Sequence, residues 1–401
     1  MGEISNDMGP FIKKHLHDDV KELALQYAKY PDIDMRQALV QIQGWQIAEK
    51  KLPLWAQTDG ILFPVHLSME QCSSQTTAEY KAEVISRLLP VRGTMTDLTG
   101  GYGVDATMMG RLFGHLTFVE PNADLCRLAQ NNLPLLGVND FNVIDGTCES
   151  VLANLDRQDL IFIDPSRRNA NGAKTFAMED CTPNVLQLQD QLLRKARMVM
   201  IKLSPMLDIT SVISCLKSVK EIHIVSVAGE CKEILALTGS ETTDSSIRIV
   251  CTNLLGNGLS QQYAFCPEDE EHAACHFTPQ VGQFLYEPNA SIMKAKCFKS
   301  IASSFSVDKL HPNSHLYTSD EYVPDFPGRS FRVTKTLPMD KQGIKELQTL
   351  RQANLSIRNF SSSVAELRKK LKLKEGGDLY IFFTTLADNH KSAIVCRKPT
   401  A

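Results

Sequence analysis

Long apolar stretches are missing from this 401-residue chain, and so are the cysteine pairs of a disulfide framework. No window approaches eighteen uninterrupted apolar residues, which argues against a membrane-spanning helix. The first residues contain neither the apolar core nor the small-residue cleavage site of a secretory signal. The eleven cysteines are scattered without a Cys-x-x-Cys pair, as expected for reduced, packed thiols. These absences predict a cytoplasmic protein without a membrane partner, and they argue against redox chemistry.

A zinc-binding pattern is missing as well. Cys266, His272, Cys275 and His276 lie close together in the sequence, but their spacing matches no closed structural zinc site. The acidic stretch PEDEEH between them is typical of a loop. We therefore expect no metal.

Net charge is small, at -3, because a basic end balances an acidic body. Residues 329–401 contain fifteen Lys or Arg against six Asp or Glu. A concentrated basic module favours a polyanionic partner. Within SVAELRKKLKLK, the cations Arg368, Lys369 and Lys372, with Lys374 close by, suit phosphate contacts. A solvated charged surface without any ligand is the alternative interpretation.

The apolar pattern changes near residue 90. From 11 to 90, apolar residues recur at spacings of three and four, which predicts helices. Beyond this point, short Val, Ile, Leu and Met runs alternate with helical stretches, which predicts crossover units and a mostly parallel sheet. The expected strands cover residues 94–98, 115–120, 141–145, 159–164, 197–203, 221–227 and 233–238. Only AGECK separates the last two, which is too short for a crossover helix, so the seventh strand should run antiparallel in a hairpin.

Composition divides the chain into four predicted domains. A helical domain covers 1–90, the sheet domain 91–241, a small α+β domain 242–326, and a basic domain 327–401. The chain becomes polar and mixed after 242, which we interpret as the exit from the sheet. In the last domain, the runs RSFRVTKTL, DLYIFFTTL and HKSAIVCRK predict strands around two helices.

A glycine-rich loop, TDLTGGYGVDA, follows the first expected strand and opens a helix. Glycine lets the backbone turn sharply and approach a ligand, and the helix start presents unpaired N–H groups. Gly100, Gly101 and Gly103 do not have the dinucleotide-binding spacing, and the Gly-Lys-Ser/Thr of a phosphate-clamping loop is absent. Asp97, just before the loop, suits a cationic group such as an amino-acid ammonium.

Acidic residues also end the next two strands. Glu120 lies where an acid can accept hydrogen bonds from both hydroxyls of a ribose, and Asp145 ends the third strand. The carboxyl ends of neighbouring parallel strands meet at one edge of a sheet. Asp97, Glu120 and Asp145 therefore predict a common ligand-binding crevice.

Residues 90–240 resemble the class I S-adenosylmethionine-dependent methyltransferases. The resemblance rests on the combination of Asp97, the glycine loop, Glu120, Asp145, Asp164-Pro165 and the closing hairpin. The resemblance implies an α/β fold with a Rossmann-like, seven-stranded, mostly parallel sheet whose last strand is antiparallel. It implies S-adenosylmethionine as the cofactor, with glycines on the methionine and ribose side, Asp97 facing the amino group and Glu120 holding the ribose. Asp145 would meet the adenine edge. The implied cofactor-binding residues are Asp97, Thr99, Gly100, Gly101, Gly103, Glu120 and Asp145.

The fourth expected strand ends in DPSRR, where methyltransferases acting on exocyclic or amide nitrogens have Asp/Asn-Pro-Pro-aromatic. The resemblance implies that Asp164 and Pro165 are catalytic, because a carboxylate and a carbonyl fixed by proline can accept both hydrogens of the target amine. Ser166 replaces the second proline, and Arg167 replaces the aromatic residue. Arginine can stack on a base or grip a phosphate, so Ser166, Arg167 and Arg168 are expected to bind substrate. Pairing of both arginines with surface acids is the alternative.

Lys202 lies at the end of the fifth expected strand, before Ser204-Pro205. We expect Lys202 to bind substrate by adding a wall to the same crevice. The alternative is that this segment simply starts the next helix.

The whole chain resembles bacterial proteins proposed as RNA methyltransferases, which carry a ferredoxin-like segment and a THUMP-like C-terminal domain. The resemblance rests on DPSRR, VAGECKEILAL, FLYEPNASIMKA and the basic end. It implies methyl transfer to a base nitrogen in structured RNA, either tRNA or rRNA, with the exocyclic amine of guanine as our guess. A non-catalytic RNA-binding protein and a protein amide N-methyltransferase are the alternatives.

Overall fold

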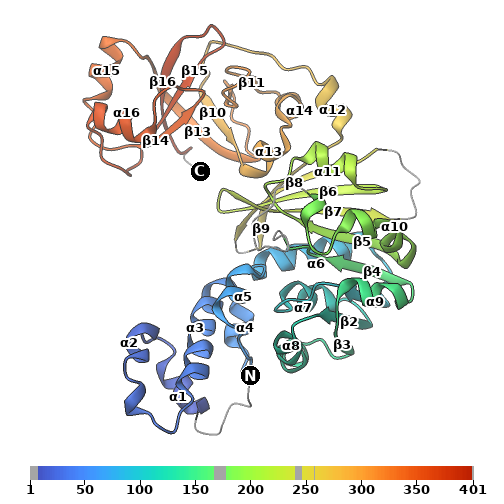
Figure 1. Ribbon diagram of the computed structural model, residues 1–401. Helices are drawn as coiled ribbons and strands as arrows, with labels where there is room; N and C mark the ends of the chain where they lie inside the picture. Colours follow the sequence, from blue (N-terminus) through green and yellow to red (C-terminus); the bar gives the residue numbers. More distant parts are fainter. Residues whose placement is uncertain (1–7, 167–177, 240–245, 257, 400–401) are drawn as a thin grey trace. The chain divides into compact units, whose positions relative to one another are not determined.

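The computed structural model describes residues 8–166, 178–239, 246–256 and 258–399 (Figure 1). The chain forms two compact units. The first contains Met1–Lys220 and Leu235–Ser245, and the second contains Glu221–Ile234 and Ser246–Ala401. None of the helices in the described ranges is long and apolar enough to cross a membrane.

Helices build the N-terminal part of the first unit, as the periodicity predicts. They are α1 (Met8–His15), α2 (Val20–Ala24), the 3-10 helix Tyr27–Lys29, α3 (Met35–Lys51), α4 (Pro53–Gln57), α5 (His66–Gln71) and α6 (Gln75–Leu88). Asp34 caps α3 and Ser74 caps α6, each by accepting a backbone N–H of the first turn. The side chains of Trp55, Met69 and Tyr102 belong to one buried cluster. This cluster packs the N-terminal helices against the helices of the sheet.

The first five strands of the sheet run parallel. They are β1 (Thr94–Asp97), β2 (His115–Glu120), β3 (Phe141–Asp145), β4 (Gln158–Ile163) and β5 (Ala196–Leu203), in the order β3-β2-β1-β4-β5. The connecting helices are α7 (Val104–Gly110), α8 (Ala123–Leu135), α9 (Cys148–Asn154), α10 (Val185–Lys195) and α11 (Ile209–Cys215), with the 3-10 turn Met178–Asp180 before α10. Figure 1 shows α7, α8 and α9 beside β2 and β3. All five strands were predicted from the sequence.

The predicted hairpin is also present. Strands β6 (Val219–Val227) and β7 (Glu230–Gly239) are neighbours in the sheet. Only Ala228 and Gly229 connect them, both at positive φ, of 51° and 81°. Two residues at positive φ fit the tight turn that joins antiparallel strands. The turn is shorter than the five residues expected from the sequence.

The predicted count of seven strands is wrong, because the described residues form nine strands in this sheet, in the order β3-β2-β1-β4-β5-β7-β6-β8-β9. The additional strands are β8 (Arg248–Gly256), parallel to β6, and β9 (Leu259–Phe265), antiparallel to β8. The interpretation of residue 242 as the exit from the sheet is therefore also wrong. The physical reason is the burial of β8, which contains the apolar run 249–251 and in which residues 249–254 are all buried. Pairing with β6 satisfies the backbone of this run.

A second sheet lies in the second unit. Its strands are β10 (Phe284–Pro288), β11 (Asp308–Lys309), β12 (Tyr317–Ser319), β13 (Gly328–Pro338), β14 (Asn354–Arg358), β15 (Tyr380–Thr385) and β16 (Lys391–Arg397), in the order β11-β12-β10-β13-β16-β15-β14. The helices of this unit are α12 (Pro267–His272), α13 (Ala290–Ala295), α14 (Phe298–Ser304), α15 (Lys341–Leu347) and α16 (Val364–Leu371).

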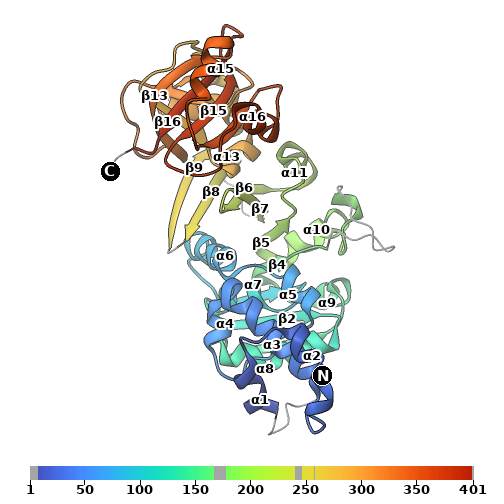
Figure 2. The same ribbon diagram turned by 90° about the vertical axis from the view of Figure 1, so that its left-hand side faces the viewer.

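Both faces of β15 are buried. Ile381 and Phe383 pack with Leu347 and Leu367 of α15 and α16, whereas Phe382, one position along the strand, belongs to a separate cluster. This alternation is the two-residue period of a strand with two covered faces. Figure 2 shows α15 and α16 beside β13, β15 and β16.

Candidate active site

The loop between β1 and α7 follows a tight path that its glycines permit. Gly101 and Gly103 have φ of 56° and 84°, which is unfavourable for other residues. The Gly100 N–H donates to the Val119 carbonyl at 2.8 Å. A Cβ at Gly100 would lie 2.2 Å from Cζ of the buried Phe118. The loop is thus pressed against β2.

Glu120 at the end of β2 holds this loop. Its Oε2 accepts a hydrogen bond from the Gly101 N–H at 2.8 Å, and its Oε1 accepts one from the Asn122 N–H at 3.0 Å. Asp145 is the residue paired with Glu120 in the register of β2 and β3, and its side chain is exposed. Burial raises the pKa of Cys126, and Asp145 and Glu120 raise it further because both carboxylates lie near this thiol. The ends of β2 and β3 therefore place these two acids at one edge.

Asp97 is the most deeply buried acid of the site, with 1% of its surface exposed. Burial raises the pKa of its carboxyl from 3.8 to about 8. A hydrogen bond from the Thr99 N–H, at 2.9 Å, opposes this shift. The negative charges of Asp105, Asp164 and Glu120 add to it. These charges can act on the pKa of Asp97 only because the four acids lie close together at one end of the sheet.

Thr99 joins the ends of β1 and β4. Its hydroxyl accepts a hydrogen bond from the Asp164 N–H at 2.7 Å and lies 3.4 Å from Oδ1 of Asp97. Asp164 directly follows β4, and the next residue, Pro165, is buried. Ser166 is exposed and exchanges two backbone hydrogen bonds with Thr182. The backbone on both sides of Pro165 is thereby held in place.

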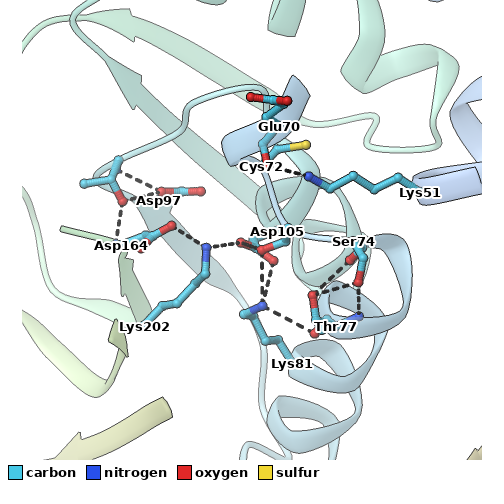
Figure 3. Close-up of polar contacts among 12 residues, drawn as sticks. Lys51, Glu70, Cys72, Ser74, Thr77, Lys81, Asp97, Asp105, Asp164 and Lys202 are labelled. Carbon is cyan, nitrogen blue, oxygen red and sulfur yellow. Dashed lines mark hydrogen bonds and ion pairs between the residues drawn. The ribbon is translucent and has the colours of Figure 1, made fainter. Parts of the chain in front are cut away.

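The expected substrate-binding residues have different outcomes. Arg167 and Arg168 lie outside the described residues. Lys202, at the end of β5, has its ammonium nitrogen 2.5 Å from Oδ2 of Asp164 (Figure 3). The structure therefore brings together Asp97, Thr99, Glu120, Asp164 and Lys202 with the glycine loop.

Sequence reasoning missed three buried residues on the far side of Lys202. Asp105, in the first turn of α7, accepts a hydrogen bond from the Ser73 hydroxyl at 2.7 Å. It also pairs with Lys81 of α6, whose ammonium lies 3.1 Å away (Figure 3). Within the segment SSQTTAEYKAEVISRLL, nothing in the spacing of the polar residues singles out Ser73 or Lys81.

Among the residues that the structure describes, no group of three or more His, Cys, Asp or Glu is arranged to hold a metal ion. His276 pairs with Asp308 at 3.0 Å, and His272 contacts the Glu268 carbonyl at 2.9 Å.

A mostly parallel sheet with a glycine-rich first loop and carboxylates at successive strand ends is the architecture that the resemblance to methyltransferases implies. Comparisons with known proteins agree. Residues 284–327 match a ferredoxin-like domain model and residues 328–398 a THUMP-like domain model. The chain superposes on the crystal structure of a proposed methyltransferase from Porphyromonas gingivalis W83 with a TM-score of 0.88, 31% identity and 98% coverage of each chain.

Two other similar structures cover only part of the chain. A proposed RNA methyltransferase from Pyrococcus horikoshii is 17% identical over 38% of this chain and 72% of its own, with a TM-score of 0.28. An rRNA methylase from Streptococcus thermophilus is 11% identical over 39% of this chain and 92% of its own, with a TM-score of 0.31. No curated protein matches the chain significantly.

The likeness to the Porphyromonas gingivalis protein spans nearly all of both chains. This protein therefore belongs to the same family of proposed methyltransferases, and its C-terminal part is a THUMP-like domain.

Replacement of Gly100 should disturb the loop. Gly100→Ala places a methyl group against Phe118, and we expect it to lower the free energy of unfolding by about 1–3 kcal/mol, as overpacking does. Gly9→Ala is the matched control, because nothing lies within 4 Å of that Cβ position in α1. Thermal unfolding of both variants checks the prediction. Equal stability of the two variants would contradict it.

Asp97 should make the stability of the protein depend on pH. The folded chain keeps the Asp97 proton up to about pH 8, whereas the unfolded chain releases it near 3.8. The free energy of unfolding should therefore fall as pH rises through this window. Asp97→Asn replaces the ionisable carboxyl with an amide that cannot ionise, and its oxygen can still accept the hydrogen bond from the Thr99 N–H. We expect its melting temperature to match that of the wild type near pH 4 and to exceed it by about 5 °C or more at pH 8.

Asp190→Asn is the matched control for Asp97→Asn. The hydrogen bond from Lys217 lowers the pKa of the exposed Asp190, so removal of this charge should give no gain at pH 8. A wild-type melting temperature that equals that of Asp97→Asn at both pH values would show that Asp97 ionises without penalty.

Proposed function

We propose that this protein transfers a methyl group from S-adenosylmethionine to a base nitrogen in structured RNA. The observation that carries the proposal is the convergence of Asp97, Glu120 and Asp164 around the glycine loop at one end of the sheet. Membership of the methyltransferase family supports the reaction class.

The residues at the strand ends fit S-adenosylmethionine. No Lys, Arg or His among the described residues pairs with the buried carboxyl of Asp97. A buried acid without a cation suits the ammonium group of the cofactor's methionine part. Glu120 keeps acceptor capacity beyond its two backbone hydrogen bonds, which suits the ribose hydroxyls. The glycine loop lies against Phe118 of β2 beside these acids, and the exposed Asp145 would meet the adenine edge.

Asp164 and Pro165 would orient the target nitrogen. When bound, S-adenosylmethionine supplies a methyl group on a positively charged sulfur, and the S–C electrons remain on sulfur when the nitrogen lone pair forms the new N–C bond. The Asp164 carboxylate, with its side chain 36% exposed, would accept one amine hydrogen and the Pro165 carbonyl the other. The amine lone pair then points at the methyl group, and the proton that the methylated nitrogen loses would pass to the Asp164 carboxylate. An exocyclic amine such as that of guanine fits this pair of acceptors.

RNA is the favoured substrate because the THUMP-like end is basic. Lys369 and Lys370 on α16, and Lys372 and Lys374 just after it, are all exposed. These cations can neutralise phosphates of a tRNA or rRNA whatever its sequence.

Loss of the Asp164 carboxylate should abolish turnover without loss of the cofactor. We expect Asp164→Ala to lower kcat by about 100-fold or more, the usual effect of removing one oriented catalytic group. S-adenosylmethionine should still raise the melting temperature of the variant. Transfer of labelled methyl groups to RNA from cells that lack the gene measures kcat, and Asp190→Ala is the surface control.

The same assay separates the alternatives. Label that disappears with RNase supports RNA methylation, whereas label that survives RNase but not protease supports the protein amide methyltransferase. A wild-type protein that binds RNA and transfers no label to any RNA or protein is the non-catalytic binder.

Neutralisation of the basic end should weaken RNA binding alone. We expect the triple variant Lys369→Gln, Lys372→Gln and Lys374→Gln to raise the KM for RNA about tenfold or more at moderate salt and to reduce the salt dependence of binding. The kcat at saturating RNA should stay unchanged. Three exposed lysines of the N-terminal helices, Lys13, Lys14 and Lys50, changed to Gln together, provide the control. If both triple variants raised the KM for RNA equally, the overall charge of the protein would attract RNA and the basic end would not be a defined docking surface.

A further inference from the structure

Four charged side chains of alternating sign form a chain that ends at the proposed catalytic acid. Lys81 pairs with Asp105 at 3.1 Å, Lys202 lies 3.8 Å from Oδ2 of Asp105, and Lys202 lies 2.5 Å from Oδ2 of Asp164. Figure 3 shows the ammonium group of Lys202 between the two carboxylates. These residues come from α6, α7, β5 and the end of β4.

Burial increases toward the far end of this chain of charges. The side chain of Asp164 is 36% exposed, those of Lys202 and Asp105 are 14% and 10% exposed, and that of Lys81 is fully buried. Burial by itself raises the pKa of Asp105. The nearby ammonium groups of Lys81 and Lys202, with the Ser73 hydroxyl, more than compensate and hold that pKa below its usual value. Asp105 is therefore a fixed anion that anchors Lys202 from behind.

We propose that Lys202 is a positioning residue for Asp164, and that the buried Lys81–Asp105 pair holds Lys202 in place. This inference rests on the proposed function, in which Asp164 receives the target amine. The Thr99 hydroxyl holds the Asp164 backbone N–H, and Lys202 holds Oδ2. Oδ1 then remains for the amine, because no described residue donates a hydrogen bond to it. Two fixed points define the direction in which Oδ1 faces.

The competing role for Lys202 is the one expected from the sequence, direct binding of substrate. To reach a phosphate, the ammonium group would have to leave two carboxylates at 2.5 and 3.8 Å. Such a move would leave Asp164 without its cation and Asp105 with only Lys81 and Ser73. The two roles predict different kinetics. A positioning residue acts on kcat, whereas a phosphate ligand acts on the KM for RNA and on its salt dependence.

Lys202→Met tests this difference, because methionine keeps much of the stem length and removes the charge. We expect kcat to fall about 100-fold, with the KM for RNA and the affinity for S-adenosylmethionine each changed by less than about threefold. Lys202→Arg restores a cation between the carboxylates, and we expect it to recover at least tenfold of the lost kcat. Lys217→Met is the matched control, since Lys217 pairs with Asp190 at 2.8 Å on the surface of the same unit.

A second variant tests the anchor. Asp105→Asn keeps Lys202 and the Ser73 contact but removes the charge that holds Lys202 from behind. We expect a fall in kcat of about tenfold at unchanged KM for RNA. Lys81→Met should lower the melting temperature by roughly 10 °C, because it leaves Asp105 as a buried anion with one partner fewer. Addition of Asp105→Asn to Lys81→Met should recover at least half of that loss.

The outcomes separate this inference from the proposed function. If the wild-type protein neither binds S-adenosylmethionine nor methylates RNA, the proposed function fails, and the positioning role fails with it. If the wild type is active and Lys202→Met keeps its kcat, only the positioning role is overturned. A raised KM for RNA with a lower salt dependence and an unchanged kcat would instead assign Lys202 to substrate binding. A fall in kcat that Lys202→Arg does not reverse would also overturn the positioning role.

Discussion

Burial of carboxylates at the carboxyl ends of parallel strands is the constraint on which the rest of the site depends. A carboxyl group removed from water must either bind a proton or find a cation. Asp97, 1% exposed and without a described cation, takes the first course, and its pKa rises to about 8. Asp105, with Lys81 and Lys202 beside it, takes the second. The same end of the sheet thus holds one acid ready for a cationic ligand and one acid already neutralised.

The backbone around Asp97 explains how these acids stay close together despite their repulsion. The carboxylates accept hydrogen bonds from neighbouring N–H groups: Asp97 from Thr99, Glu120 from Gly101 and Asn122, and Asp164 from the ammonium group of Lys202. The backbone N–H of Asp164 in turn donates to the Thr99 hydroxyl. The glycine loop supplies one of these N–H groups because it lies directly against β2, where Phe118 leaves no room for a side chain at Gly100. The close packing of the loop against β2 therefore also fixes the positions of the acids.

Much of the sheet and part of the site could be predicted from the sequence, because both follow from local pattern. Strands β1 and β2 end in Asp97 and Glu120, and Asp164 directly follows the apolar end of β4. This pattern identifies the three acids as neighbours. Strand β8 was missed because Ser, Thr and Asp flank its apolar run, although Gly256 and Gly258 at the following turn are a hairpin signal. The role of Lys81 could not be predicted, since its position on α6 does not distinguish a buried, paired lysine from an ordinary surface lysine. Only the packing of α6 against α7 makes Lys81 a buried partner of Asp105.

The N-terminal helices consequently belong to the site as well as to the scaffold. A buried ion pair is weak evidence for stability, because its desolvation cost is comparable to its attraction and an apolar pair often replaces it without loss. Lys81 and Asp105 are almost completely buried, yet the pair continues through Lys202 to the partly exposed Asp164. If the pair served stability alone, nothing would require it to continue toward the exposed end of β4. A connection from the Lys81–Asp105 pair to Asp164 is needed if the pair serves to orient the Asp164 carboxylate. Through this connection, α6 helps to determine the geometry at the end of the sheet.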